Sequence, residues 1–128
     1  MPRTIAIPSL GILTYPSVMQ RRVAMLMVHT CPLEQAGIGD AGGMNIYVAE
    51  SAARMAAQGV EVDIFTRRDH LDLPAVVELS PGVNVHHLDA GHDLHWTKEQ
   101  VPAHFKELTA EFKKALSSDQ SYDLIHSH

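Results

Sequence analysis

The sequence predicts an α/β protein with a Rossmann-like, doubly wound and mostly parallel sheet. Apolar runs typical of strands alternate with segments of helical periodicity, and the connections between them are short. The first apolar run shows no alternation, which suits a strand covered on both faces. A glycine-rich segment follows this run, at the edge of the sheet where open α/β proteins bind ligands.

The first half of the chain supplies one strand and one helix. The first strand is expected at Val23 to Val28, and a loop containing Pro32 and two glycines follows it. Asp40 is expected to cap a helix that runs to about Gln58. Gly59 stands where a glycine commonly ends a helix. Four apolar residues recur at helical spacing and are expected to face the sheet: Met44, Val48, Ala52 and Met55.

Three short β runs come next. They are Val60 to Thr66, Val76 to Leu79 and Val83 to Leu88, and the turn Ser80-Pro81-Gly82 separates the last two. The run Asp123 to His126 predicts the final strand.

A second helix is expected between the last two of these strands. Thr97 and Gln100 stand at capping-box spacing. Pro102 is tolerated only in a first turn, so the regular helix is expected to begin near Val101, after a single turn. Its expected apolar stripe is Val101, Phe105, Leu108, Phe112 and Leu116.

Composition and charge exclude several classes of protein. With 128 residues, 45% of them hydrophobic, the chain can form one domain at most. A formal net charge of −5 argues against nucleic-acid binding. The only cysteine, Cys31, excludes an internal disulfide and suits the cytoplasm. The apolar stretch within residues 1–21 is too short to span a membrane, and Pro8 and Pro16 interrupt it. This segment also lacks the anatomy of a secretory signal.

The chain is expected to divide near residue 22. Residues 1–21 are interpreted as an amino-terminal extension that is poorly ordered or that results from a start assigned too early. Residues 22–128 are interpreted as an incomplete Rossmann-like domain, because the last strand lacks a following helix and parallel sheets are normally covered on both faces. The chain is therefore expected to be a fragment.

The segment Gly37 to Gly43 matches the dinucleotide fingerprint G-x-G-x-x-G, but its surroundings do not. Eight residues separate the first strand from Gly37, and the second strand ends in Thr66-Arg67-Arg68 where an acidic residue is expected. An arginine there leaves an NADP site as an alternative. No Lys-Ser or Lys-Thr follows the glycines, so the Walker pattern fails.

Phosphate binding by this segment follows from its position alone. Gly42 and Gly43 are expected in the first turn of a helix, where unpaired amides and a positive dipole favour an anion. Glycines allow a phosphate to approach the backbone closely. The alternative is a glycine-rich turn that serves only to reverse the chain. Against it, two glycines in a helix cost roughly 1 kcal/mol each in helix propensity.

Several segments together resemble a known family. They are His29-Thr30, Pro32-Leu33-x-Gln35 and Gly39 to Tyr47, which reads GDAGGMNIY. This pattern resembles the amino-terminal domain of retaining glycosyltransferases with the GT-B fold, and most closely the actinobacterial D-inositol 3-phosphate glycosyltransferases of mycothiol synthesis. The resemblance covers nearly everything from Arg22 onward, and sucrose-phosphate synthases carry a looser version of it. Other similar segments are Gly59 to Arg67, Pro81-Gly82-Val83, Thr97 to Glu99 and Tyr122 to His128.

The resemblance implies a reaction and a set of site residues. These enzymes transfer N-acetylglucosamine from UDP-N-acetylglucosamine to inositol phosphate, with retention at the anomeric carbon. By resemblance, Gln35 and Ala36 lie beside the donor, and the backbone of Gly43 approaches its diphosphate. Lys98 pairs with the acceptor's phosphate, although without the resemblance it would be interpreted as a solvated surface lysine. The other implied acceptor residues are His29, Asp40, Ala41, Gly42, Gly43, Met44 and Asn45.

Three departures from the family pattern bear on the acceptor more than on sugar transfer. Ala36 stands where the family usually has proline, Cys31 replaces a usual serine, and residues 90–96 differ from the usual segment before the lysine. The chain has nine histidines, but none of the pairs forms a recognisable zinc ligand set, so no metal site is expected. The pair His126 and His128 ends a strand, which makes a ligand-facing role the expectation.

The sequence therefore leads to one main hypothesis and two alternatives. The chain is interpreted as the acceptor-side part of a UDP-sugar glycosyltransferase, inactive by itself because most donor contacts lie in a second domain of the family. It needs no cofactor of its own. The resemblance allows Mg²⁺ with the donor, and a homodimer, in a full-length enzyme. The alternatives are a related transferase with another acceptor and a non-catalytic nucleotide- or phosphate-binding module.

Overall fold

The computed structural model describes residues 21–28, 30–34, 37, 42–91, 96–117 and 121–128. Within these residues the strands form one five-stranded sheet in the order β3-β4-β2-β1-β5. None of the helices in the described ranges has the length and apolar character needed to cross a bilayer. The elements are β1 Arg21–Leu26, α2 Gly43–Ala57, β2 Val60–Arg67, β3 Val76–Ser80, β4 Val83–Leu88, the 3₁₀ helix η2 Val101–His104, α3 Phe105–Leu116 and β5 Leu124–Ser127.

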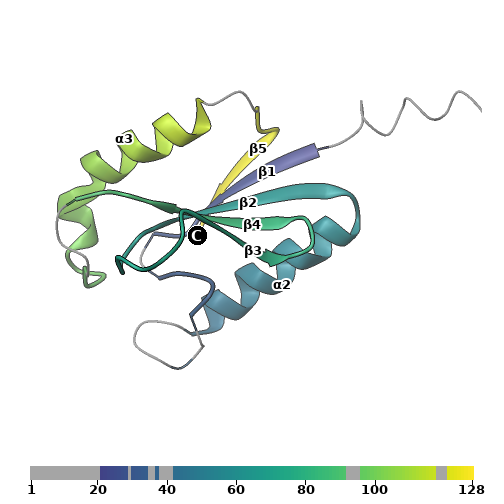
Figure 1. The fold of residues 1–128 in the computed structure, drawn as a ribbon, viewed down its shortest axis with the longest axis horizontal. Helices are drawn as coiled ribbons and strands as arrows, with labels where there is room; N and C mark the ends of the chain where they lie inside the picture. The colour runs from purple at the N-terminus through teal and green to yellow at the C-terminus, as the bar shows by residue number, and fades with distance from the viewer. Residues whose placement is uncertain (1–20, 29, 35–36, 38–41, 92–95, 118–120) are drawn as a thin grey trace, which may run out of the picture.

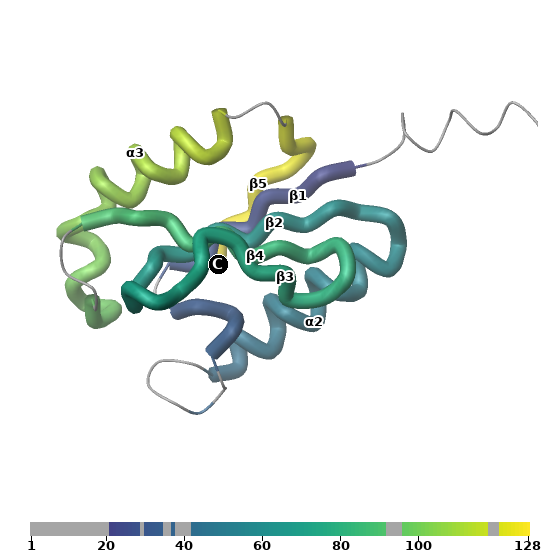
Figure 2. Tube along the Cα trace, viewed as in Figure 1, coloured from purple at the N-terminus to yellow at the C-terminus, as the bar shows by residue number. Residues whose placement is uncertain are grey.

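The sheet is mostly parallel and doubly wound, as the sequence predicts. Strand β1 lies parallel to both β2 and β5, and β4 lies parallel to β2. Only β3 runs antiparallel, paired with β4 through a turn that contains Gly82 at φ +82°. Helix α2 covers one face of the sheet and α3 the other (Figure 1). The segments that leave β1, β2 and β4 emerge at the same end of the sheet, where both helices begin (Figure 2).

Alternation along β1 and β2 directs side chains into a separate core on each face of the sheet. On the α2 face, the buried residues of the strands pack against Val48 and Ala52 of the helix. On the α3 face, Phe65 packs against Phe112, with ring centroids 5.4 Å apart. A third cluster lies at the beginning of α3 and contains Ala90, Trp96, Val101 and Leu108.

A buried polar network lies on the α3 face, near the start of the strands. Asp63 accepts hydrogen bonds from Arg22 Nη2 at 2.7 Å, Tyr122 Oη at 2.7 Å and His86 Nε2 at 2.9 Å. The Asp63 side chain is only 8% exposed, so these three partners compensate its desolvation. The network joins β1, β2, β4 and the residues before β5, and it lies at the opposite end of the sheet from the glycine-rich segment.

Four sequence predictions about the helices are wrong in detail. Helix α2 begins at Gly43, and its N-cap is Gly42, two residues later than the predicted cap. The predicted capping residue Asp40 lies outside the described residues. Met44 is 37% exposed because the first turn of α2 faces the loop after β1, where Asn45 is buried in its place.

Phe105 is the third exception. Its side chain is 51% exposed although Leu108 and Phe112 are buried as predicted. A 3₁₀ turn has three residues per turn, so η2 shifts the faces of Val101 and Phe105 apart before the regular helix begins. The regular helix was also predicted to begin near Val101, but it begins at Phe105, because Val101–His104 form the 3₁₀ helix η2. The glycine that follows α2, Gly59 with φ +89°, agrees with the prediction.

Candidate functional site

The candidate site lies at the carboxyl ends of β1, β2 and β4, around the beginning of α2. The two loops nearest to it are tied together by hydrogen bonds. Thr66 Oγ1, at the end of β2, donates to the carbonyl of Thr30 at 3.2 Å, and Met27 N donates to Phe65 O at 2.9 Å. The loop after β1 is thereby fixed against β2 and directed toward α2.

The glycines at the start of α2 leave open space above the backbone. A Cβ atom added to Gly42 or Gly43 would meet no described atom within 4 Å. Neither residue has a positive φ, so backbone conformation does not require glycine at either position. Asn45 N donates to Gly42 O at 3.0 Å and Gly42 N donates to Asn45 Oδ1 at 3.3 Å, whereas no described residue accepts from the amides of Gly43 and Met44. Unpaired donors beside open space suit a bound anion, and this observation weighs against a purely structural turn.

Asn45 fixes the start of the helix to the loop after β1. Its Nδ2 donates to the carbonyl of Cys31 at 2.7 Å and to Thr30 Oγ1 at 3.3 Å. Its Oδ1 accepts from the amide of Gly42 at 3.3 Å. The side chain is buried, and both hydrogens of its amide group are used. In this arrangement Asn45 positions the backbone of Gly42 and Gly43.

The buried thiol of Cys31 and the imidazole of His87 form a pair that holds the loop after β1. His87 Nδ1 lies 2.7 Å from the carbonyl oxygen of Pro74, which can only accept, so Nδ1 carries the proton. His87 Nε2 is then the acceptor for the Cys31 thiol, whose sulfur lies 3.4 Å away. Burial raises the pKa of Cys31 to about 11. The thiol therefore stays protonated and has a structural role at neutral pH.

An aromatic stack holds the segment before Lys98. The guanidinium of Arg67, at the end of β2, lies 3.5 Å from the centroid of the Trp96 ring. The ring of His104 stacks on Trp96 at 4.1 Å with an interplanar angle of 9°. Arg67 is buried, and its Nε donates to the carbonyl of Ala90 at 3.1 Å. Arg67 thus anchors both ends of residues 90–96, and Lys98 lies two residues beyond the anchor, exposed, in the turn before η2.

The end of β5 brings two histidines to the carboxyl ends of the parallel strands, where the candidate site lies. The rings of His126 and His128 are 4.3 Å apart, and the His128 ring lies 5.8 Å from that of Tyr47 in the first turns of α2. Burial, followed by the charge of His126, lowers the pKa of His128. The Nε2 atom of His128 is enclosed and has no hydrogen-bond partner among the described residues.

The structure describes only part of the predicted site. Gly42, Gly43 and Asn45 lie together at the start of α2, with Met44 beside them. Lys98 lies at the same end of the sheet, and no described interaction joins it to these residues. The remaining predicted residues lie outside the described residues: His29, Gln35, Ala36, Asp40 and Ala41.

The sequence does not predict the positions of Arg67 and Thr30 in the site. It indicates an NADP contact as the only ligand role of Arg67, because nothing in it shows that the guanidinium packs on a tryptophan 29 positions later. Its position at the end of a buried strand was the available signal. Thr30 accepts from Asn45, a contact between residues that the pattern places on different elements.

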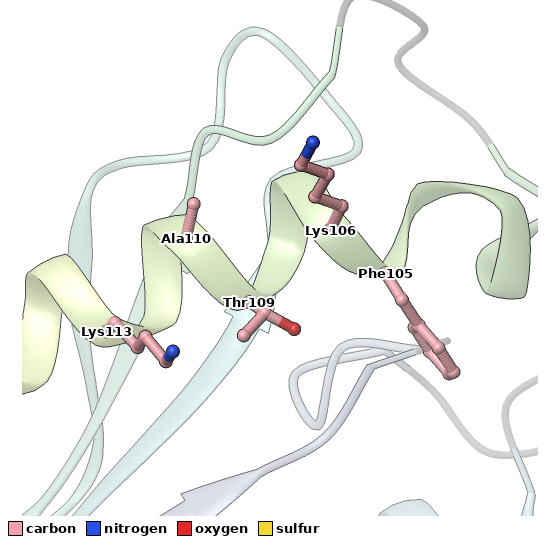
Figure 3. Close-up of a pocket in the computed structure, with 5 residues that line it drawn as sticks. All are labelled: Phe105, Lys106, Thr109, Ala110 and Lys113. Atoms are coloured by element: carbon pink, nitrogen blue, oxygen red, sulfur yellow. The ribbon is translucent and has the colours of Figure 1, made fainter.

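Two other features of the surface contain groups that a ligand or a metal ion could contact. A shallow hollow lies over Phe105, Lys106, Thr109, Ala110 and Lys113, and Figure 3 shows that all five side chains come from one helix, α3. No second element contributes a convergent polar group, so we do not assign it a function. Near the end of β2, one group of three metal-ligating side chains stands out among the described residues: Glu34, Asp69 and His70.

Comparison with known proteins agrees with this geometry. The family model of the glycosyl transferase 4-like domain matches residues 42–128. A D-inositol 3-phosphate glycosyltransferase of Streptomyces scabiei is 54% identical over 110 residues, and one of Geodermatophilus obscurus is 50% identical over 114 residues. These alignments cover 84% and 88% of this chain, and 25% of each relative. The chain thus spans about a quarter of the length of these curated relatives.

A solved structure extends the comparison to the fold. The sucrose-phosphate synthase of Thermosynechococcus elongatus matches with a TM-score of 0.77 and 33% sequence identity, over 84% of this chain and 27% of that one. On these findings, the chain belongs to the glycosyl transferase 4-like domain family and forms part of the Rossmann-like amino-terminal domain of a GT-B glycosyltransferase.

Proposed function

We propose that the protein carrying this chain transfers N-acetylglucosamine from UDP-N-acetylglucosamine to 1D-myo-inositol 3-phosphate, a step of mycothiol synthesis. One observation carries the proposal: relatives named for D-inositol 3-phosphate are about half identical over the segment that contains both the start of α2 and Lys98. The cytoplasm is the proposed location, and the single buried thiol of Cys31 fits a reducing compartment.

The start of α2 is proposed to face the phosphates of the reaction. The backbone amide of Gly43 lies beside open space and favours an anion, and a diphosphate can approach it without meeting a side chain. We assign Gly43, with Gln35 and Ala36, to the donor. We assign the acceptor to residues from the same segment and from the loop after β1: His29, Asp40, Ala41, Gly42, Gly43, Met44 and Asn45.

Lys98 is proposed to pair with the phosphate of the acceptor. An exposed ammonium is a compact point charge, which suits a phosphate dianion. The stack of Arg67 on Trp96 reduces the freedom of the segment leading to Lys98, so less entropy is lost when the phosphate binds. Asn45 contributes to the acceptor site by positioning the glycine backbone, since both hydrogens of its amide group are engaged by Thr30 and Cys31.

The isolated 128-residue chain is proposed to have no transferase activity. It corresponds to about a quarter of its relatives, and the residues that serve the departing diphosphate lie in the second domain of the family. In a full-length enzyme, Mg²⁺ can accompany the donor diphosphate, and the enzyme can form a homodimer.

The experiment that tests the proposal is an assay of UDP release by the intact protein, with UDP-N-acetylglucosamine and inositol phosphate. Lys98→Ala is expected to raise KM for inositol phosphate by roughly ten- to a hundredfold, because a charge-assisted contact worth about 1.5–3 kcal/mol is lost. KM for the donor is expected to change little. Lys106→Ala is the matched control, since Lys106 lies on the outer face of α3 (Figure 3).

Absence of UDP release by the intact protein would contradict the transferase, and equal effects of Lys98→Ala and Lys106→Ala would contradict the acceptor site. The similarity to a sucrose-phosphate synthase favours one second candidate, a transferase with a hexose phosphate acceptor. UDP release with a hexose phosphate and none with inositol phosphate would select it. Binding of UDP-N-acetylglucosamine without turnover would indicate a non-catalytic binding module.

A further inference from the structure

The loops after β1 and β2 bring three metal-ligating side chains together. Glu34 follows β1, and Asp69 and His70 follow β2; one ligand atom from each lies within 4.8 Å of the other two. Asp69 Oδ1 and His70 Nε2 are 3.8 Å apart, which is too far for a hydrogen bond. We propose that these three residues, the Glu34–Asp69–His70 site, bind a divalent transition-metal ion of the zinc type.

The spacing of the three side chains is close to that of a coordination shell. Zinc holds imidazole nitrogen and carboxylate oxygen at about 2.0–2.2 Å, so two of its ligand atoms are separated by about 3.3 Å at a tetrahedral angle. The observed separations, 3.8 Å between Asp69 and His70 and at most 4.8 Å within the group, are longer, so a side chain must move inward to close on an ion. His70 can make this movement, since its side chain is 64% exposed, whereas that of Asp69 is 20% exposed.

One carboxylate oxygen of the site has no hydrogen-bond partner. Asp69 Oδ1 is enclosed by protein and accepts no hydrogen bond from any described residue. A buried acceptor in this state carries an uncompensated desolvation cost. A metal ion between Asp69 and His70 would remove that cost. No side chain in the described part of the chain does so.

The backbone on both sides of the site is fixed before any ion binds. Glu34 N donates to the carbonyl of Cys31 at 3.0 Å, closing a turn in the loop after β1. Arg68 N donates to Leu88 O at 2.8 Å, and Leu73 N donates to His70 O at 3.2 Å. Since each loop is closed by its own hydrogen bonds, binding loses mainly side-chain freedom.

The donor set selects the class of ion. One imidazole with two carboxylates suits Zn²⁺ or Co²⁺, whereas Mg²⁺ and Ca²⁺ prefer oxygen ligands alone. Cys31 is not part of the set, because its thiol is buried and bonded to His87. Three protein ligands leave a position for water or for an oxygen of a bound molecule, as in open zinc sites. The inference does not depend on the proposed transfer reaction.

Calorimetric titration of ZnCl₂ into the intact, chelator-treated protein tests the site. We expect one equivalent of Zn²⁺ to bind, and Asp69→Asn and His70→Ala each to weaken binding by roughly tenfold or more. His126→Ala is the matched control, because His126 is an exposed histidine at the end of β5, and it is expected to leave this affinity unchanged. Circular dichroism of each variant confirms that it is folded.

A second measurement keeps the test independent of the variants. Co²⁺ added to the unmodified protein is expected to shift the imidazole resonances of His70, and to leave those of His104 in place. No binding of Zn²⁺ at millimolar concentration would overturn the proposal. So would equal affinity in Asp69→Asn and the unmodified protein, or loss of binding in His126→Ala alone.

Discussion

At the scale of the residue, glycine at positions 42 and 43 could serve either the fold or a bound phosphate, and the sequence does not distinguish the two. The structure shows that neither backbone conformation nor packing against described atoms requires it. By contrast, Gly91 has φ +76°, and a Cβ there would lie 2.4 Å from Trp96 Cζ2. The fold therefore requires glycine at position 91. It does not require glycine at positions 42 and 43, where ligand binding is the proposed reason for glycine.

The first prediction concerns Gly43. Gly43→Ala is expected to leave the free energy of unfolding unchanged or to raise it by up to about 1 kcal/mol, because alanine is the better helix former. It is expected to weaken binding of the donor, since a methyl group would occupy the space above the amides. Chemical denaturation and calorimetric titration of UDP-N-acetylglucosamine measure the two effects. Unchanged donor affinity together with unchanged stability would count against a phosphate at this helix start.

The second prediction concerns Cys31. With its pKa raised to about 11 by burial, and its proton donated to His87, the thiol is expected to react with iodoacetamide far more slowly in the native protein than in denaturant. The native rate is expected to rise only as the pH approaches 11. Cys31→Ser should keep the hydrogen bond to His87 and cost at most about 1 kcal/mol. Rapid alkylation of the native protein at pH 7 would show that the loop opens.

At the scale of the element, periodicity predicted every strand and both helices to within a few residues. The strand boundaries moved by one or two residues, which is the usual uncertainty of an element's end. The beginning of each helix was less predictable, because it depends on a tertiary contact or on a turn type. Asn45 is buried by Thr30 and Cys31 of another element, and η2 changes the period from 3.6 to 3.0 before Phe105.

The third prediction concerns the network that links β1, β2 and β4 through Asp63. Burial alone would raise the pKa of Asp63, but hydrogen bonds from His86 and Tyr122 and the charge of Arg22 hold it below its usual value. A carboxyl with a lowered folded-state pKa stabilises the fold fully above its unfolded pKa of about 3.9. That contribution is lost as the pH falls through the folded value.

Asp63→Asn is accordingly expected to cost about 3 kcal/mol at pH 7, and to make unfolding less dependent on pH below about 4. Urea denaturation across this range measures both effects. Glu61→Gln is the control, because Glu61 also pairs with Arg22 at 2.7 Å but its side chain is 48% exposed. Its expected cost is below about 1 kcal/mol. Similar costs for the two variants would contradict the special role of the buried carboxylate.

At the scale of the whole molecule, β5 is an outer strand of the described sheet. The sequence predicted a last strand without cover, and all four residues of β5 are exposed, with Leu124 at 57% and Ile125 at 53%. The candidate site was only partly predictable for a related reason. Glu34 and Asp69 are 35 residues apart in the sequence, and Arg67 and Trp96 are 29 apart. Only the order of the strands brings the members of each pair close together.

The fourth prediction follows from this edge. As an isolated 128-residue chain, the protein is expected to associate as its concentration rises, because an unpaired apolar edge strand is a template for pairing. Ile125→Lys is expected to reduce association several-fold, since a charged edge strand resists pairing. Sedimentation velocity measures it, with Leu71→Lys, another exposed apolar residue far from β5 in the sequence, as the control. Association that survives Ile125→Lys would place the contact elsewhere.

The stack of Arg67, Trp96 and His104 has a practical consequence. Trp96 is the only tryptophan of the chain, so the intrinsic fluorescence of the protein reports on this one stack. Its emission is sensitive to the imidazole and guanidinium on its two faces, and it lies two residues from Lys98. The molecule therefore carries its own optical probe of the segment proposed to meet the acceptor, and binding there can be followed without a label.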